Sequence, residues 1–207
     1  MKRLTLISAA GLLLSGCGSV HPGAAAVVDG TTISMDTLDR TASIYCLDAS
    51  RQAEGQDGGL AGQRGRAAID LVLQRISADM VAERGLEVDE SLAEIPDDAL
   101  PAIEEAFGDA PDAVDVIGES VELGARFAAI GADVTGEEAT DANLQELQSA
   151  GYQAVLAEVP DHDVTFDPRL GVDRDAVATG GSGSLSVPTS SDQPGGTALS
   201  PALQCSD

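Results

Sequence analysis

The sequence predicts a mainly helical domain that carries a short N-terminal β-hairpin and a small returning C-terminal strand. Between residues 35 and 158, apolar side chains recur three and four positions apart, which is the spacing of amphipathic helices. Ahead of them, Asp29-Gly30 separates two short β-prone runs, which is the signal of a two-residue hairpin turn. Behind them, Val164 to Phe166 is a short β-prone run that Pro168 halts.

The first 16 residues have the layout of a bacterial export signal. "MKR" supplies a basic start, and the uncharged run from Leu4 to Gly16 is too short to span a bilayer, which takes about 20 apolar residues. The run ends in Leu14-Ser15-Gly16-Cys17, which resembles the lipobox of bacterial lipoproteins residue for residue. In that class the peptidase cuts before the cysteine, and the thiol carries a diacylglyceryl group with acyl chains such as palmitate. The alternative is a cleaved signal followed by an incidental cysteine.

Acylation of Cys17 predicts a protein that is lipid-anchored to the cell membrane and faces the extracytoplasmic side. Two acyl chains anchor a protein stably in the lipid bilayer, whereas one chain binds only marginally. Residues 1–16 are then the signal, and residues 17–23 are a tether with a reach of roughly 15 Å. We expect residues 24–172 to form the helical domain and residues 173–207 to form a flexible C-terminal segment.

Periodicity and capping signals place the helices along the chain. Ser34 is expected to cap a helix that buries Leu38, Ala42 and Tyr45 on one face. Gly85 is expected to end the second and most strongly patterned helix. The helices are expected over about residues 35–52, 63–84, 90–95, 101–107, 109–134 and 135–158, the last one starting at a capping-box pattern, Thr135 to Glu138. From Ala176 the composition changes to Gly, Ser, Thr and Pro, which is typical of a flexible segment.

Composition restricts the classes of partner. The whole chain has a formal net charge of −24, and removal of the signal leaves nine arginines against 35 acidic residues, a net charge of −26. Such a surface repels nucleic acid, which proteins bind through Lys and Arg. It also repels anionic lipid, so the acyl group must hold the protein to the membrane. The acidic surface favours solubility first and basic clients second.

The two other cysteines, Cys46 and Cys205, are expected to form a disulfide. An exported protein meets an oxidising compartment, and acylation of Cys17 leaves an even count. The bond would pin the end of the chain onto the first long helix. Because the closed loop is long, chain entropy predicts a stabilisation of roughly 4–5 kcal/mol. The competing interpretation is two separate thiols.

The order of these parts resembles the N-terminal chaperone lobe of the SurA/PrsA foldases. That lobe has a "vnG-x-x-I" strand pair, a helix, and a long helix that closes on a "G-x-x-V-x-D/S" turn. "VVDGTTIS" and "GLEVDES" are similar to these two motifs. The family's returning "v-v-x-P-R-Y-G" segment is similar to Asp167-Pro168-Arg169-Leu170-Gly171, with leucine in place of the aromatic residue. The tail from Ser200 to Cys205 resembles the "LP-x-x-Q-x-C" end of SurA-N-like bacterial lipoproteins.

This resemblance covers about residues 24–172 and the tail, and it implies a helical SurA-N-like lobe without the family's enzymatic part. The parvulin prolyl isomerase domain is replaced by helix-patterned sequence from Glu90 to Val159. A parvulin site uses histidines and aromatic residues, whereas this chain has only His21 and His162. We therefore expect no prolyl isomerase activity.

Other chemistries lack their residues. After removal of the signal the chain has no lysine, which excludes a Walker A loop and a lysine Schiff base, and it has no G-x-S-x-G elbow. The acids around His162 lack EF-hand spacing and are interpreted as a solvated turn rather than a calcium site. We expect no catalytic residue, no metal and no cofactor.

Two functions fit these expectations. The first is a membrane-anchored holdase-like chaperone that binds unfolded exported polypeptides. The second is a structural or adaptor lipoprotein that binds one dedicated partner in the cell envelope. In the first function, unfolded clients would bind a candidate groove formed by Ile69, Val72, Leu73, Ile76, Leu123 and Phe127. Each of these six residues is also interpretable as part of the ordinary hydrophobic core.

Overall fold

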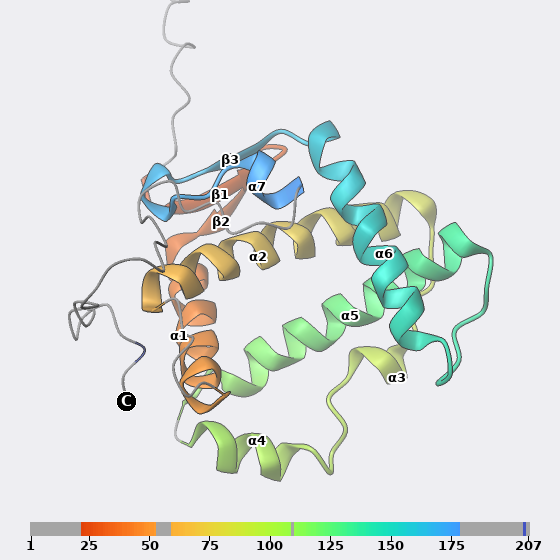
Figure 1. Cartoon of the computed structure of the whole chain (residues 1–207), viewed down its shortest axis with the longest axis horizontal. Coiled ribbons are helices and arrows are strands. Elements are labelled where there is room, and N and C mark those ends of the chain that lie inside the picture. The colour runs from red at the N-terminus through yellow and green to blue at the C-terminus, as the bar shows by residue number, and fades with distance from the viewer. Residues whose placement is uncertain (1–21, 53–58, 109, 179–204, 206–207) are drawn as a thin grey trace, which may run out of the picture.

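A computed structural model describes residues 22–52, 59–108, 110–178 and 205 of the chain (Figure 1). The predicted signal, Cys17 and most of the tether lie outside the described residues. The described part is mainly helical and carries a small antiparallel sheet, which confirms the predicted fold class. None of its helices is long and apolar enough to cross a membrane.

The sheet joins the two ends of the domain. Its strands are β1 (Ala24–Val28), β2 (Thr31–Ser34) and β3 (Val164–Phe166), in the order β2-β1-β3. Ala26 of β1 pairs with Ile33 on one side and with Phe166 on the other. Asp29 and Gly30 have φ values of +48° and +79°, which is the left-handed backbone that a two-residue hairpin turn requires. The predicted hairpin and returning strand are therefore confirmed.

Two long helices follow the hairpin. α1 (Met35–Gln52) starts where the Ser34 hydroxyl accepts a hydrogen bond from the Thr37 N–H at 3.0 Å, as the capping prediction requires. α2 (Gly59–Arg84) runs beside the sheet in Figure 1 and ends at Gly85, whose φ is +61°. α2 begins four residues earlier than the sequence predicts, and Leu60 of its first turn lines a cavity together with Cys46 and Leu47 of α1.

The next helices form the lower and right-hand parts of Figure 1. They are α3 (Glu90–Ala93), α4 (Leu100–Phe107), α5 (Ala113–Thr135) and α6 (Leu144–Glu158). The predicted start of the last of these was wrong. Thr135 is the end of α5, where its hydroxyl donates to the Gly131 carbonyl at 2.8 Å, and Gly136 ends the helix with φ +72°. α6 begins only after Asn143, whose side chain accepts from the Thr140 N–H at 2.8 Å.

The chain then returns to the sheet through short elements. These are η1 (Val159–Asp161), β3, η2 (Pro168–Leu170) and α7 (Arg174–Ala178). The first residues of the segment 173–207 are ordered rather than flexible, because α7 is helical and its Val177 is fully buried, whereas residues 179–204, 206 and 207 lie outside the described residues. Val177 belongs to the main core, so a buried apolar contact orders this segment against its composition.

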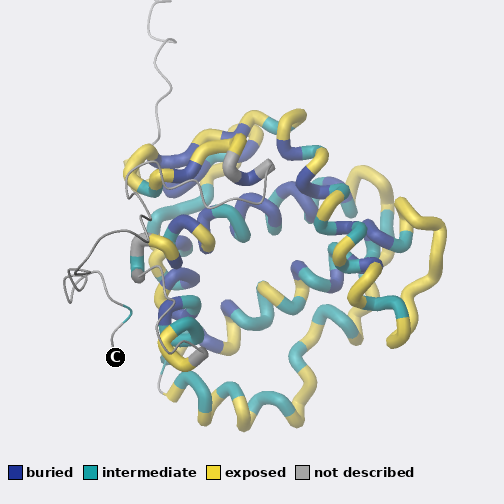
Figure 2. The backbone as a smooth tube through the Cα atoms, in the orientation of Figure 1, coloured by how far each residue is buried: buried dark blue, intermediate teal, exposed yellow. Residues whose placement is uncertain are grey.

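The main core lies between β1, α1, α2, the second half of α5 and α6. Figure 2 shows buried residues along these elements, whereas α3 and α4 carry only half-buried and exposed ones. A second, smaller core joins α1 to the start of α5 through Ile44, Ala113 and Val116, with Phe107 of α4 packed against it. The buried core is almost entirely aliphatic, in keeping with the low aromatic content of 2%, and Phe166 is the aromatic residue buried in it among the described residues.

Candidate functional site

The residues predicted to line a client groove lie in or against the hydrophobic interior. Val72, Leu73 and Ile76 are buried in the main core, and Leu123 is buried on α5. Ile69 and Phe127 are half-buried against the same core. A client would reach the four buried side chains only if the helices moved apart, so the groove stays a prediction.

The surface of the described residues is poor in large apolar side chains. Only Val114 and Val134 are classed as exposed among them, at 40% and 48%. They lie at opposite ends of α5, so they do not form one patch. Isolated exposed apolar residues are normal on soluble proteins, whereas binding of varied unfolded clients needs a contiguous patch.

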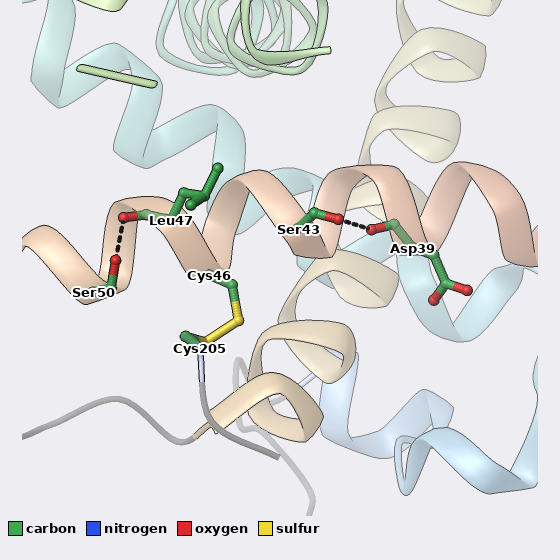
Figure 3. The surroundings of a disulfide bond; sticks show 6 residues. All are labelled: Asp39, Ser43, Cys46, Leu47, Ser50 and Cys205. Carbon is green, nitrogen blue, oxygen red and sulfur yellow. Dashed lines mark hydrogen bonds between the residues drawn. A yellow bond between two sulfur atoms is a disulfide. The ribbon is translucent and has the colours of Figure 1, made fainter. Parts of the chain in front are cut away.

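Cys46 and Cys205 form the predicted disulfide (Figure 3). Their Cα atoms are 5.0 Å apart although the residues are separated by 159 positions in sequence. Cys46 is buried on α1 beside a cavity that Leu47 and Leu60 also line. The bond holds Cys205 on α1, close to the start of α2.

A polar cluster lies where α1, α2 and α5 meet. The Tyr45 hydroxyl is hydrogen-bonded to the Asp70 carboxylate and to Ser120, and the Arg66 guanidinium lies 5.2 Å from the centre of the Tyr45 ring. Burial raises the pKa of Asp70, although the hydrogen bond from Tyr45 opposes that shift. Burial also raises the pKa of Tyr45. Its members come from α1, α2 and α5, so we interpret the cluster as a polar link between these helices.

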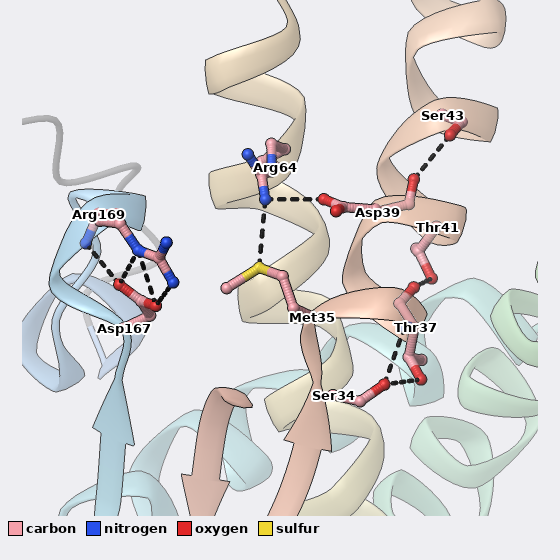
Figure 4. A network of polar contacts seen from close by, with 9 residues as sticks. All are labelled: Ser34, Met35, Thr37, Asp39, Thr41, Ser43, Arg64, Asp167 and Arg169. Carbon is pink, nitrogen blue, oxygen red and sulfur yellow. Dashed lines mark hydrogen bonds and ion pairs between the residues drawn. The ribbon is translucent and has the colours of Figure 1, made fainter. Parts of the chain in front are cut away.

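Two further polar groups lie near each other, one between α1 and α2 and one at the start of η2 (Figure 4). Arg64 of α2 pairs with Asp39 of α1 at 2.7 Å and contacts the Met35 sulfur at 3.2 Å. Asp167 is almost fully buried, and hydrogen bonds from the side chain of Arg169 lower its pKa. The positive charge of Arg64 lowers the same pKa to a smaller extent.

His162 pairs with the hairpin turn. Its Nδ1 lies 2.6 Å from Asp29 Oδ2, and the Asp163 N–H donates to Asp29 Oδ1 at 2.8 Å. The hydrogen bond with His162 lowers the pKa of Asp29. No group of three His, Cys, Asp or Glu side chains in the described part of the chain is arranged to hold a metal ion. The hydrogen bonds of His162 and Asp163 with Asp29 join the β1–β2 turn to the loop before β3.

Negative charge is concentrated on one part of the fold. Residues 85–146, which include α3, α4 and α5, contain 18 acidic residues and a single arginine, Arg126. Arg126 is neutralised by an ion pair with Glu122 on its own helix. The arginines of the other elements are also mostly paired with neighbouring acids, as in Arg75–Asp79 and Arg40–Glu119. The unbalanced charge therefore lies on the α3–α5 side of the molecule.

This acidic part contains an apolar groove, here called the alanine groove. Its volume is about 320 Å³, and four alanines of α5 form its floor: Ala125, Ala128, Ala129 and Ala132. Leu86 and Leu92 line it from the segment that follows α2 and from α3. Four carboxylates also line it: Glu87, Asp89, Asp133 and Glu138. Sequence reasoning missed this groove, although the four alanines follow the i, i+3, i+4, i+7 spacing of one helix face.

Comparison with protein-family models, with curated proteins and with solved structures finds no match to this chain. The resemblance to the SurA/PrsA foldases therefore stays a prediction that rests on the quoted motifs.

Proposed function

We propose that the chain is a lipid-anchored, extracytoplasmic binding protein for polypeptides, without catalytic activity of its own. The observation that carries the proposal is the single-signed surface of residues 85–146, with 18 acids against one arginine, on a folded domain. A surface of one sign accelerates encounters with an oppositely charged partner and disfavours others. The lipobox supports the anchor, and the predicted attachment site is Cys17.

A dedicated partner in the cell envelope is the better supported of the two binding functions. A folded partner can be recognised through charge and shape, and it does not need an extended apolar patch. The large apolar side chains of the described residues are mostly buried, which fits this adaptor role.

The holdase role is the second candidate. It is supported by the observed order of hairpin, long helices and returning strand, which is the order on which the chaperone-lobe resemblance rests. In this role the helices over Val72 and Ile76 would have to separate to bind a client.

The test is chemical crosslinking of the acylated full chain in its native membrane, followed by quantitative mass spectrometry. The adaptor function predicts one basic partner in stoichiometric amount. The holdase function predicts many substoichiometric clients, together with suppression of aggregation of unrelated unfolded proteins. If the crosslinking recovers neither one stoichiometric partner nor many clients, the polypeptide-binding function is contradicted. A Cys17→Ala variant tests the anchor separately, because it should leave the membrane fraction.

A further inference from the structure

The alanine groove has an apolar floor and charged walls, a combination that suits one kind of side chain. Ala125 and Ala128 are buried, so the floor presents methyl groups and offers no large side chain to fill the space. A lysine or arginine has an aliphatic stem and a charged head, and it lowers its free energy when the stem lies on apolar surface while the head stays solvated or paired.

Two of the four groove carboxylates already have partners. Asp133 accepts from Arg84 at 3.2 Å, and Asp89 caps α3 by accepting from the Ser91 N–H at 2.9 Å. Glu87 and Glu138 are exposed, and within the part of the chain that the structure describes neither carboxylate makes an ion pair or a hydrogen bond. The two come from different loops, one before α3 and one after α5. These two carboxylates are therefore the ones open to a cation from another molecule.

We propose that the alanine groove binds a lysine or arginine side chain from an extended basic segment of the partner, with the stem on the alanines and the head between Glu87 and Glu138. The inference rests on the proposed polypeptide-binding function and specifies the chemistry that it recognises. Its occupant follows from charge complementarity, since Arg84 reaches only Asp133 among the groove carboxylates and residues 85–146 contain one arginine against 18 acids.

The test uses the full acylated chain in detergent and a short synthetic peptide that alternates lysine with alanine. Affinity is measured by fluorescence anisotropy for the wild type, for Glu87→Gln/Glu138→Gln, and for the control Glu104→Gln/Glu105→Gln. The control changes the net charge equally at two exposed residues of α4. We expect the groove variant to weaken binding by about tenfold, as the loss of two exposed ion pairs predicts, and the control to stay within about twofold.

An Ala129→Leu variant tests the floor without a change of charge. Ala129 is half-buried, so the larger side chain can occupy the groove, and we expect the peptide to lose affinity while circular dichroism shows an unchanged helical content.

Equal weakening by the groove and control variants would show general attraction to an acidic surface and overturn the proposal. So would the absence of any binding by the peptide. If crosslinking recovers the same partner from wild type and from Glu87→Gln/Glu138→Gln, the proposed function stands and the groove assignment fails.

Discussion

Gly151 of α6 lies directly against the backbone of Phe127 in α5, with no room between them for a β-carbon. The relationship is reciprocal one turn away, where Gly131 of α5 lies against the carbonyl group of Leu147 in α6. The two helices therefore touch backbone to backbone at two points. This close approach also brings the rings of Phe127 and Tyr152 into an edge-to-face contact with centroids 5.6 Å apart.

Gly151→Ala should destabilise the fold. The added methyl group would overlap the Phe127 carbonyl group, which belongs to a helix backbone and cannot rotate away, so α5 and α6 must separate. We expect a loss of about 1–3 kcal/mol in the free energy of unfolding, the range typical of overpacked cores. Urea denaturation followed by circular dichroism measures it.

Gly118→Ala is the matched control for this substitution. It lies on α5, where an added β-carbon would meet only Ile95 at an ordinary 3.8 Å. Because alanine is the better helix former, this variant should be neutral or more stable by up to about 1 kcal/mol. Equal destabilisation by both substitutions would contradict the backbone contact between α5 and α6.

Tyr45→Phe should also destabilise the protein, through its effect on Asp70. The substitution keeps the ring but removes the hydroxyl that is hydrogen-bonded to the Asp70 carboxylate. Asp70 is partly exposed and keeps its ion pair with Arg66, so we expect a loss of about 0.5–1.5 kcal/mol, the net contribution of one hydrogen bond. Tyr152→Phe is the control, since no hydroxyl partner of Tyr152 is found among the described residues, and we expect little change. Thermal unfolding of both variants beside the wild type decides the point, and equal midpoints would refute the link.

The parts of the fold that the sequence predicted well are those that local chemistry determines. Asp29-Gly30 forms its turn because both residues tolerate the left-handed backbone. Ser34 caps the helix that it was predicted to cap. Thr135 misled the prediction because Thr-x-x-Glu suits a capping box, yet Gly136 also ends a preceding helix, and the two signals overlap.

The parts that the sequence did not predict depend on contacts between distant elements. Val114 is exposed near the start of α5, because the packing of α1 and α4 turns its neighbours Ala113 and Val116 inward. Val177 is buried where α7 packs on η1, α6 and β3. The alanine groove needs two separate loops to approach α5, and helical periodicity alone does not describe that approach. Candidate groove residues such as Val72 have the helical spacing of an apolar face. That spacing is the same for a face that binds a client and for a face that packs in the core, so it does not distinguish the two.

Reduction or removal of the disulfide should weaken the fold without abolishing it. Cys46→Ser/Cys205→Ser removes a link across 159 residues, for which chain entropy predicts up to roughly 5 kcal/mol and measurements on small domains typically give about 2–5 kcal/mol. Chemical denaturation of the variant and of the wild type, with and without reductant, measures the change. The reductant should lower the stability of the wild type alone. A wild-type mass that does not rise by two hydrogens on reduction would contradict the bond itself.

Acid should release the contact between His162 and the hairpin turn. The hydrogen bond with His162, with a second from the Asp163 N–H, holds the pKa of Asp29 below its usual value of 3.8. A carboxyl group whose pKa is lowered by folding contributes stability above its unfolded pKa and loses that contribution as the pH falls through its folded pKa.

Asp29→Asn tolerates the same left-handed backbone and can still accept from Asp163, but it carries no charge. The wild type should therefore be more stable than Asp29→Asn at neutral pH, and the difference should vanish in acid below 3.8. Urea denaturation across this pH range measures the difference, with Asp161→Asn as a control beside the same loop. A gap between wild type and Asp29→Asn that persists unchanged into acid would mean that the Asp29 charge does not stabilise the turn.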